Sequence, residues 1–414
     1  MNTEATPSQS IHNARLIVLA RLISDFGAFL NMVALSTYVY MLSNSAMSIG
    51  IFLACRVAGG ITAGIVGTPF FRHWTGKIPL ICFDLLRAFL VLLLLIVPTQ
   101  QQLLLLPVIA FGIGFGHSMF SIGLNSQMPR LINAEHRVNA NAWITSAASS
   151  GAVVGSLISG LLVAGFGYQL VFAINITTYI VATMFILPLR MLSIRRTAEF
   201  PHLRQDWIQL RHGLKAAPLM AGMLLVTMMD TLGSAAHNVG FPILSKLLTP
   251  ESASTTMGLL LAVWACGKFA GARIASRILK TNQLRSMEKT FFFGVLAMSG
   301  GFILVFQQSE LVWLLCAAIP AGLGDGLAEV GLVSRLQQEP DQLRLPAFSL
   351  LTVLQMSGFG IGMLISAPFY EFWAPAHVVL VFHGLPILTA ILVLWRWSGI
   401  NRYGNEPAER ESVN

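Results

Sequence analysis

The sequence predicts an all-α integral membrane protein whose twelve transmembrane helices form two pseudo-symmetric six-helix bundles. Three observations support this fold class. Of the 414 residues, 55% are hydrophobic and 11% are charged, which gives more apolar surface than a soluble domain of this length buries. Twelve apolar runs of about 20 residues recur, each long enough to cross a hydrocarbon layer of about 30 Å as a helix. The second half of the sequence also repeats the pattern of the first.

The repeat is clearest where Arg137 superposes on Arg344, at an offset of half the chain length. Further identical pairs at this offset are Ala140 and Ala347, Thr145 and Thr352, Gly151 and Gly358, Gly155 and Gly362, Ser159 and Ser366, Gly60 and Gly267, Gly64 and Gly271, and Asn31 and Asn238. Chance matching among small and apolar residues is the alternative. A duplicated six-helix unit accounts better for the single shared offset.

The apolar runs set the expected order of the elements. We place the spans at approximately 16–41, 46–70, 78–98, 103–126, 142–166, 168–189, 218–245, 256–278, 290–307, 311–334, 346–368 and 377–397. These spans imply an N-terminal tail at 1–14, a first bundle at 15–190, a linker at 191–217, a second bundle at 218–397 and a C-terminal tail at 398–414. The first run is too long for a signal peptide and no cleavage pattern follows it. All four cysteines fall inside spans, where we expect small core residues.

Basic residues concentrate in alternate connections between these runs. They are Arg72 and Lys77; Arg130 and Arg137; Arg190, Arg195, Arg196, Arg204, Arg211 and Lys215; Lys280, Arg285 and Lys289; Arg335 and Arg344; and Arg396, Arg402 and Arg410. The positive-inside rule therefore places both termini and the linker in the cytoplasm. The net charge of +8 follows from this topology and does not indicate a nucleic-acid partner.

Small and polar residues indicate how the first half packs. The second span has four glycines within 59–67, which permit close helix contact. Asp84 and Arg87 stand at i,i+3 in the third span, where they can form an ion pair. In the fourth span, polar side chains at four-residue spacing share one face that should avoid lipid: His117, Ser121 and Asn125. The linker contains the amphipathic segment 206–215, which we expect at the membrane surface.

The second half repeats this plan and adds charges. Its polar intramembrane residues are Asp230, Ser234 and His237 in the seventh span, Lys268 in the eighth, Asp325 and Glu329 in the tenth, and Gln355 in the eleventh. The first half adds Asp25 and Arg56. A charged side chain at the bilayer centre costs about 2.5–3.5 kcal/mol on insertion scales. We therefore expect these groups to face a cavity or a partner.

Twelve spans in two halves, a basic linker and a half-length repeat resemble the major facilitator superfamily over nearly the whole chain. The segments 128–179 and 334–355 are similar to the branch that contains macrolide-efflux proteins and the enterobactin exporter. The resemblance implies a monomeric transporter in the bacterial cytoplasmic (inner) membrane, with no enzymatic activity. It implies a small-molecule substrate and protons as partners, a lipid bilayer as surroundings, and no cofactor or metal.

Two signatures of this superfamily are altered here. The loop between the second and third helices usually reads Gly-x-x-x-Asp-Arg; Gly67 and Arg72 match it, but Phe71 replaces the acid. We therefore expect this chain to close its cytoplasmic side by other contacts.

The second signature lies in the fifth helix of exporters and reads Gly-x-x-x-Gly-Pro-x-x-Gly-Gly. Gly151, Gly155 and Gly160 match it, whereas Ser156 replaces the proline and Ser159 a glycine. The match favours efflux. We expect the glycines of the fifth helix, with Gly358 and Gly362 of the eleventh, to act in packing that lets the bundles rock.

In this superfamily, helices 1, 4, 7 and 10 line the central cavity, and here they carry Asp25, His117, Asp230, Asp325 and Glu329. Burial raises the pKa of a carboxyl group into a range that a proton gradient can use. Asp325 or Glu329 is our first candidate for the proton carrier, followed by Asp230 and then Asp25. Arg56, His117, Asn125, Ser234, His237, Lys268 and Gln355 are the candidates for the substrate cavity.

Fixed ion pairs are the competing interpretation of these charges: Arg56 with Asp25, and Lys268 with Asp230 or Asp325. Arg56 and Lys268 instead suit an anionic, siderophore-like substrate. His117 and His237 also fit a purely structural role as hydrogen-bonded interior histidines.

The favoured function is proton-coupled efflux of a drug-like or siderophore-like molecule by antiport. Proton-coupled import is the alternative, and a membrane receptor or enzyme is a more distant one. No phosphate-binding loop of the type Gly-x-x-x-x-Gly-Lys-Ser/Thr occurs in the sequence, so an ion gradient must supply the work. No His-Glu-x-x-His metal motif occurs either.

Overall fold

The computed structural model describes residues 7–43, 46–189, 203–251, 253–279 and 283–403, and within these ranges the regular elements are all helices. In chain order they are α1 (Pro7–Ser43), α2 (Ala46–His73), α3 (Lys77–Ile96), α4 (Thr99–Leu131), α5 (Ala134–Ile186), α6 (Leu203–Ala216), α7 (Pro218–Leu248), α8 (Ala253–Ile278), α9 (Leu284–Phe306), α10 (Leu311–Leu336), α11 (Asp341–Phe372) and α12 (Pro375–Tyr403).

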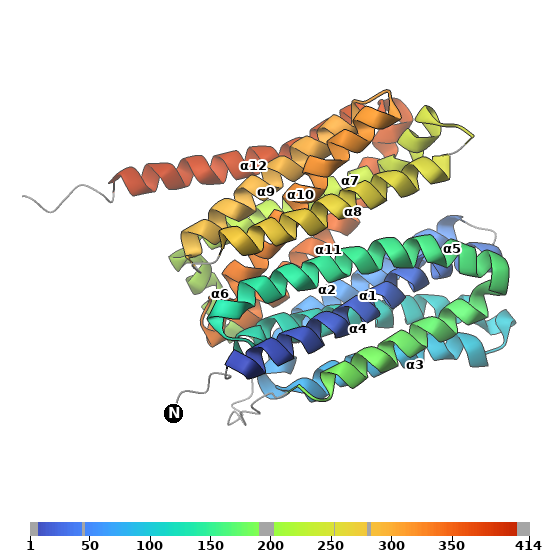
Figure 1. The fold of residues 1–414 in the computed structure, drawn as a ribbon, viewed down its shortest axis with the longest axis horizontal. Helices are drawn as coiled ribbons and strands as arrows, with labels where there is room; N and C mark the ends of the chain where they lie inside the picture. The colour runs from blue at the N-terminus through green and yellow to red at the C-terminus, as the bar shows by residue number, and fades with distance from the viewer. Residues whose placement is uncertain (1–6, 44–45, 190–202, 252, 280–282, 404–414) are drawn as a thin grey trace, which may run out of the picture.

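Eleven of these helices are long and apolar enough to cross a membrane. α5 crosses twice, because its 53 residues would be about 80 Å long if straight. Its backbone turns at Gly167, where φ is 79°, a conformation that favours glycine. Figure 1 shows the chain reversing direction there, at the right of the view. The predicted break between the fifth and sixth spans is therefore confirmed, and the chain makes the twelve crossings that the sequence predicted.

The crossings form two bundles, a first half made by α1–α5 and a second half made by α7–α12 (Figure 1). Two seams join them: α2 packs on α11, and α5 packs on α8. The sequence repeat relates α2 to α8 and α5 to α11. The repeat therefore converts the contact of α2 with α11 into the contact of α8 with α5, and the two seams are equivalent. Pseudo-symmetry thus extends from the halves to the contact between them.

Glycines allow the helices to approach closely at the seams and inside each half. A Cβ atom on Gly64 of α2 would lie 2.5 Å from Val353 of α11, and a Cβ on Gly67 would lie 3.0 Å from Ile122 of α4. The Thr68 hydroxyl donates to the Ser349 hydroxyl across the same seam at 2.8 Å. The first seam is therefore held by small residues and one polar contact.

The repeated glycines of α5 and α11 face equivalent neighbours. A Cβ on Gly155 would lie 2.5 Å from the Phe26 carbonyl of α1, and one on Gly151 would lie 2.8 Å from the Phe26 nitrogen. Gly358 and Gly362 make the same approach to α7, each with a backbone oxygen 2.7 Å from the added Cβ. Gly160 differs from our expectation, because it is exposed and no described atom lies within 4 Å of its added Cβ. Its predicted packing role does not hold in this conformation.

Three other details differ from the sequence-based expectation. α1 begins at Pro7, inside the segment expected to be a tail. α6 covers the amphipathic part of the linker but packs on α11, with Leu210 buried and Gly213 against Leu343; residues 190–202 lie outside the described ranges. Three of the four cysteines are exposed on the helix surfaces, so they are not core residues.

Candidate functional site

A cavity of about 400 Å³ lies between the two halves. The first half contributes residues of α1 and α4, and the second half contributes residues of α7 to α11. Seven of the candidate proton-coupling and substrate-cavity residues line it: Asn125, Asp230, Ser234, Lys268, Asp325, Glu329 and Gln355. A volume of this size is in the range of small-molecule sites in proteins.

Lys268 forms the electrostatic centre of this cavity. Its Nζ lies 3.1 Å from an Asp325 carboxylate oxygen and 2.8 Å from one of Glu329. The two acids stand one turn apart on α10, so one ammonium group on α8 meets both. Close contact of α8 and α10 permits this, since a Cβ on Gly326 would lie 2.2 Å from the Lys268 carbonyl. The pairing of Lys268 with Asp325 was one of the predicted ion pairs; the pairing with Glu329 was not predicted.

Glu329 also faces the other half of the protein. Besides Lys268, it interacts with the Thr145 hydroxyl of α5 and with the Arg21 guanidinium of α1. Arg21 in turn pairs with Asp25 at 3.1 Å, one helical turn away. The predicted pair of Asp25 with Arg56 is therefore replaced by a local pair on α1. The Glu329 carboxylate therefore lies within electrostatic reach of both halves.

Asp230 differs from the other acids of the cavity. Within the described residues, no basic group lies within 4 Å of its carboxylate, and its buried Oδ1 has no hydrogen-bond partner. It lies on α7 with Thr227, Thr231 and Ser234, which line the same side of the cavity. The structure thus places at the cavity one carboxylate that is in no ion pair, with Lys268 and Asp325 as its more distant charged neighbours.

Four candidates do not line the cavity: Asp25, Arg56, His117 and His237. Arg56 and His117 lie inside the first half and interact electrostatically with each other, and Arg56 also interacts with Tyr179. His237 stacks on Phe302 at 3.9 Å and lies 2.9 Å from His383 of α12, nitrogen to nitrogen. This arrangement is the structural role that was the alternative for His237. His383 was missed, because nothing in its apolar span marked it.

The predicted pair of Asp84 and Arg87 is confirmed and is fully buried in the first half. Arg87 also lies over the Tyr179 ring at 4.5 Å and the Phe120 ring at 5.5 Å. The pair is thereby enclosed by protein on all sides. It supports the packing of α3 against α4 and α5 and does not reach the cavity.

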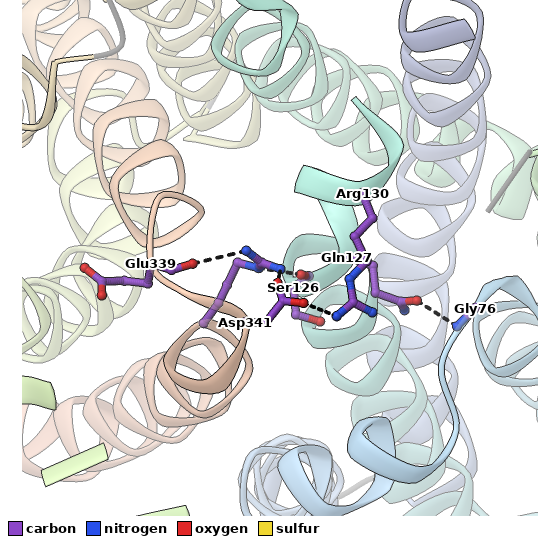
Figure 2. A network of polar contacts seen from close by, with 7 residues as sticks. Gly76, Ser126, Gln127, Arg130, Glu339 and Asp341 are labelled. Atoms are coloured by element: carbon purple, nitrogen blue, oxygen red, sulfur yellow. Dashed lines mark hydrogen bonds and ion pairs between the residues drawn. The ribbon is translucent and has the colours of Figure 1, made fainter. Parts of the chain in front are cut away.

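Polar contacts join the two halves at one end of the helices. We call this the linker end, where α6 and the α4–α5 and α10–α11 connections lie (Figure 1). Asp341 of α11 pairs with Arg130 of α4 in the other half and with Arg344 on its own helix. Arg344 Nε donates to the Ser126 carbonyl of α4 at 2.7 Å. Figure 2 shows these groups meeting between the ends of α4 and α11.

A second contact closes the linker end beside α10. The Asn141 amide of α5 donates to the Ser334 hydroxyl at 2.9 Å and to the Gln337 side-chain oxygen at 2.8 Å. In the sequence, Arg130 appeared only as a topological charge and Arg344 only as a topological charge and a member of the repeat; Asn141, Ser334 and Asp341 were not singled out. Their role depends on contacts between residues far apart in the sequence, and no local motif predicts such contacts.

The altered loop signature is accounted for at this end. Phe71, at the position of the missing acid, is buried against Phe83 and Gly123. Arg72 reaches Gln209 of α6 at 3.4 Å, although both side chains are accessible to solvent. An aromatic contact therefore occupies the position of the usual ionic one, and Arg130 and Asp341 supply a charged contact between the halves.

Comparison with known proteins agrees with this architecture. Residues 17–344 match the sequence model of the Major Facilitator Superfamily. The chain belongs to this superfamily. No curated protein sequence matches it, so the macrolide-efflux and enterobactin-exporter branch is not confirmed.

Solved transporters of this superfamily share the fold. The human organic anion transporter TETRAN is 13% identical, with a TM-score of 0.77 over 93% of this chain and 99% of that one. A bacterial homologue of the iron transporter ferroportin, in an outward-facing state, is 14% identical, with a TM-score of 0.76 over 94% and 99%. The E. coli fucose:proton symporter is 12% identical, with a TM-score of 0.70 over 93% and 99%. The chain is therefore a multi-pass membrane transporter by family and fold.

Proposed function

We propose that this transporter exports a small organic molecule from the bacterial cytoplasm in exchange for protons, by alternating access across the inner membrane. The observation that carries the proposal is the contact of Lys268 with two carboxylates in the cavity. One of these, Glu329, also faces Thr145 and Arg21 of the opposite half. A group that touches both halves changes its surroundings whenever the halves move apart.

Proton binding to this cluster is coupled to closure of the linker end. With the end closed, Glu329 pairs with Lys268 and also interacts with Thr145 and Arg21 of the first half. Opening this end withdraws Thr145 and Arg21, which leaves two carboxylates to share one ammonium group. A proton then compensates for the lost partner, so each conformation has its own preferred protonation state.

Export requires that the linker end face the cytoplasm, which is the orientation we propose from the basic connections. In that orientation the structure is closed to the cytoplasm. Import by proton symport uses the same groups and is the alternative, supported by the fold shared with the fucose:proton symporter. The partial exporter signature at Gly151 and Gly155 favours export. A receptor or an enzyme is the more distant alternative, because the family that the chain matches consists of transporters.

Flux in everted membrane vesicles tests the proposal. Vesicles are energised to an acidic interior and offered three probes: chloramphenicol, ethidium and 5-carboxyfluorescein. Export predicts accumulation of at least one probe, which collapses when the pH gradient is dissipated. Uptake of the same probe only into right-side-out vesicles with an acidic exterior would establish import and remove export. The absence of gradient-driven flux for all three probes would contradict the proposal.

Two variants test the proton carrier. Glu329→Gln and Asp325→Asn remove one carboxylate each, and we expect the loss of gradient-driven flux in at least one, with probe exchange retained. Glu135→Gln is the matched control, because this exposed carboxylate lies in the first turn of α5 outside the cavity. If gradient-driven flux is unchanged in both test variants, the proton carrier is Asp230 or Asp25 instead.

A further inference from the structure

We propose that the cavity is built for an organic cation, whose charged nitrogen lies against the Asp230 carboxylate. This inference deepens the proposed function and rests on it, since it takes the central cavity as the substrate site. It replaces the anionic substrate that Arg56 and Lys268 suggested in the sequence. The argument has three parts: the charges that face the cavity, the groups around Asp230, and the position of Arg56.

The basic groups that line the cavity are all in ion pairs, whereas one of the lining acids is not. Its two basic groups, Arg21 and Lys268, are each already paired with acids. Lys268 is shared by two carboxylates, and Arg21 by Asp25 and the more distant Glu329. Asp230 alone among the lining acids lacks a basic partner within 4 Å in the described part of the chain. An anion entering the cavity would find no free cation, whereas a cation would find a free carboxylate.

Desolvation gives the unpaired carboxylate its preference for a cation. A buried charge without a partner is unfavourable. The buried Asp230 Oδ1 also lacks a hydrogen bond, which adds a second unfavourable contribution. A protonated amine or a quaternary ammonium supplies the missing positive charge. An anionic ligand would instead place a like charge beside Asp230.

The surroundings of Asp230 fit the remainder of such a ligand. Thr227, Thr231 and Ser234 line the cavity from the same helix, α7, and their hydroxyl oxygens can accept hydrogen bonds from an ammonium group. Phe291 and Phe348 line the cavity as well, and aromatic faces attract organic cations. The cavity therefore combines an acid, neutral acceptors and aromatic walls.

Arg56 is the group that an anionic substrate would need, and it lies elsewhere. It is not part of the cavity lining but interacts electrostatically with His117 and Tyr179 within the first half. In the described residues it has no acid within 4 Å. Substitution of Arg56 therefore tests the competing hypothesis, in which the substrate is an anion.

Equilibrium binding of two ions of matched size and opposite charge tests the inference. Purified full-length protein in detergent is titrated with tetraphenylphosphonium and with tetraphenylborate, and binding to protein-free micelles is subtracted. We expect the phosphonium ion to bind with a Kd at least tenfold lower than that of the borate. Asp230→Asn should raise the phosphonium Kd at least tenfold. Asp230→Glu keeps the negative charge, so its phosphonium Kd should lie within about threefold of that of the unchanged protein. Glu371→Gln, an exposed acid at the end of α11, should leave it unchanged.

Three results would overturn the inference: no phosphonium binding, phosphonium binding that is unchanged in Asp230→Asn, or tighter borate binding that is lost in Arg56→Gln. The flux experiment separates this failure from that of the proposed function. Gradient-driven flux of chloramphenicol or 5-carboxyfluorescein without phosphonium binding removes the cation site and keeps the transporter. Phosphonium binding at Asp230 without gradient-driven flux of any probe removes the proton coupling and keeps the cation site.

Discussion

At the scale of single residues, the charge balance of the cavity depends on Lys268. The sequence located the intramembrane charges but identified only part of their pairing. The position of a residue along a span predicts its depth in the membrane. The ion-pair partner of the residue depends in addition on how the helix is rotated about its axis. Asp25 illustrates this, because it pairs with Arg21 one turn away and not with Arg56 on another helix.

Replacement of Lys268 tests this balance. Lys268→Met leaves the carboxylates of Asp325 and Glu329 without their shared cation. Loss of one partner from a fully buried ion pair costs about 3–5 kcal/mol. These side chains are 16–39% exposed, so we expect a smaller loss of about 1–3 kcal/mol, read from thermal unfolding of the purified protein.

The control is the triple variant Lys268→Met/Asp325→Asn/Glu329→Gln, which removes the unpaired charges together with the lysine. Its stability should return most of the way to that of the unchanged protein. A triple variant as unstable as Lys268→Met alone would show that packing of the lysine stem, and not charge, explains the loss.

At the scale of helices, the sequence predicted the order of the spans and a break between 166 and 168, but several helices extend beyond the predicted bounds: α1 begins at Pro7 where 16 was expected, and α5 at Ala134 where 142 was expected. Apolar length and helix-breaking glycine are local properties, and both can be read along the chain. Which glycines touch another helix is not local. Gly155 and Gly160 belong to the same signature, yet five residues turn a helix by about 140° at 3.6 residues per turn, so they face different directions.

This difference predicts opposite effects of the same substitution in α5. Gly155→Ala places a Cβ 2.5 Å from the Phe26 carbonyl and should lower stability by about 1–3 kcal/mol through overpacking. Gly160→Ala meets no described atom within 4 Å and should be neutral, or stabilising by up to about 1 kcal/mol through helix propensity. Thermal unfolding of both variants in one detergent provides the measurement. Equal losses in the two would contradict the assignment of the seam between α1 and α5.

At the scale of the whole molecule, the half-length repeat predicted two bundles but not how they meet. The contact between Arg130 and Asp341 joins residues 211 positions apart. Neither residue belongs to a motif, and periodicity carries no information about such a pair. The loss of the acid at Phe71 indicated only that closure had to differ; the structure supplies the charged pair and the Asn141 contacts.

Removal of the Asp341 carboxylate should favour opening of the linker end. Asp341→Asn weakens the contacts to Arg130 and Arg344, so solvent should reach the cavity more often from this end. The measurement is labelling of a Thr227→Cys reporter by an impermeant maleimide added to everted vesicles, with the native cysteines replaced by serine. We expect labelling several-fold faster than in the parent reporter protein, whereas Glu135→Gln should not change it. An unchanged rate in Asp341→Asn would show that the linker end is held by other contacts.

The first turns of α1 reach the same end, with practical consequences for protein engineering. Asn13 donates to the Leu131 carbonyl at 3.0 Å, and the Ser10 hydroxyl accepts from the Asn133 nitrogen at 3.1 Å. A bulky fluorescent or affinity fusion placed directly before Pro7 would sit beside the junction of α4 and α5. Reporter proteins for transport assays are better attached after α12, whose last turns extend away from this junction (Figure 1).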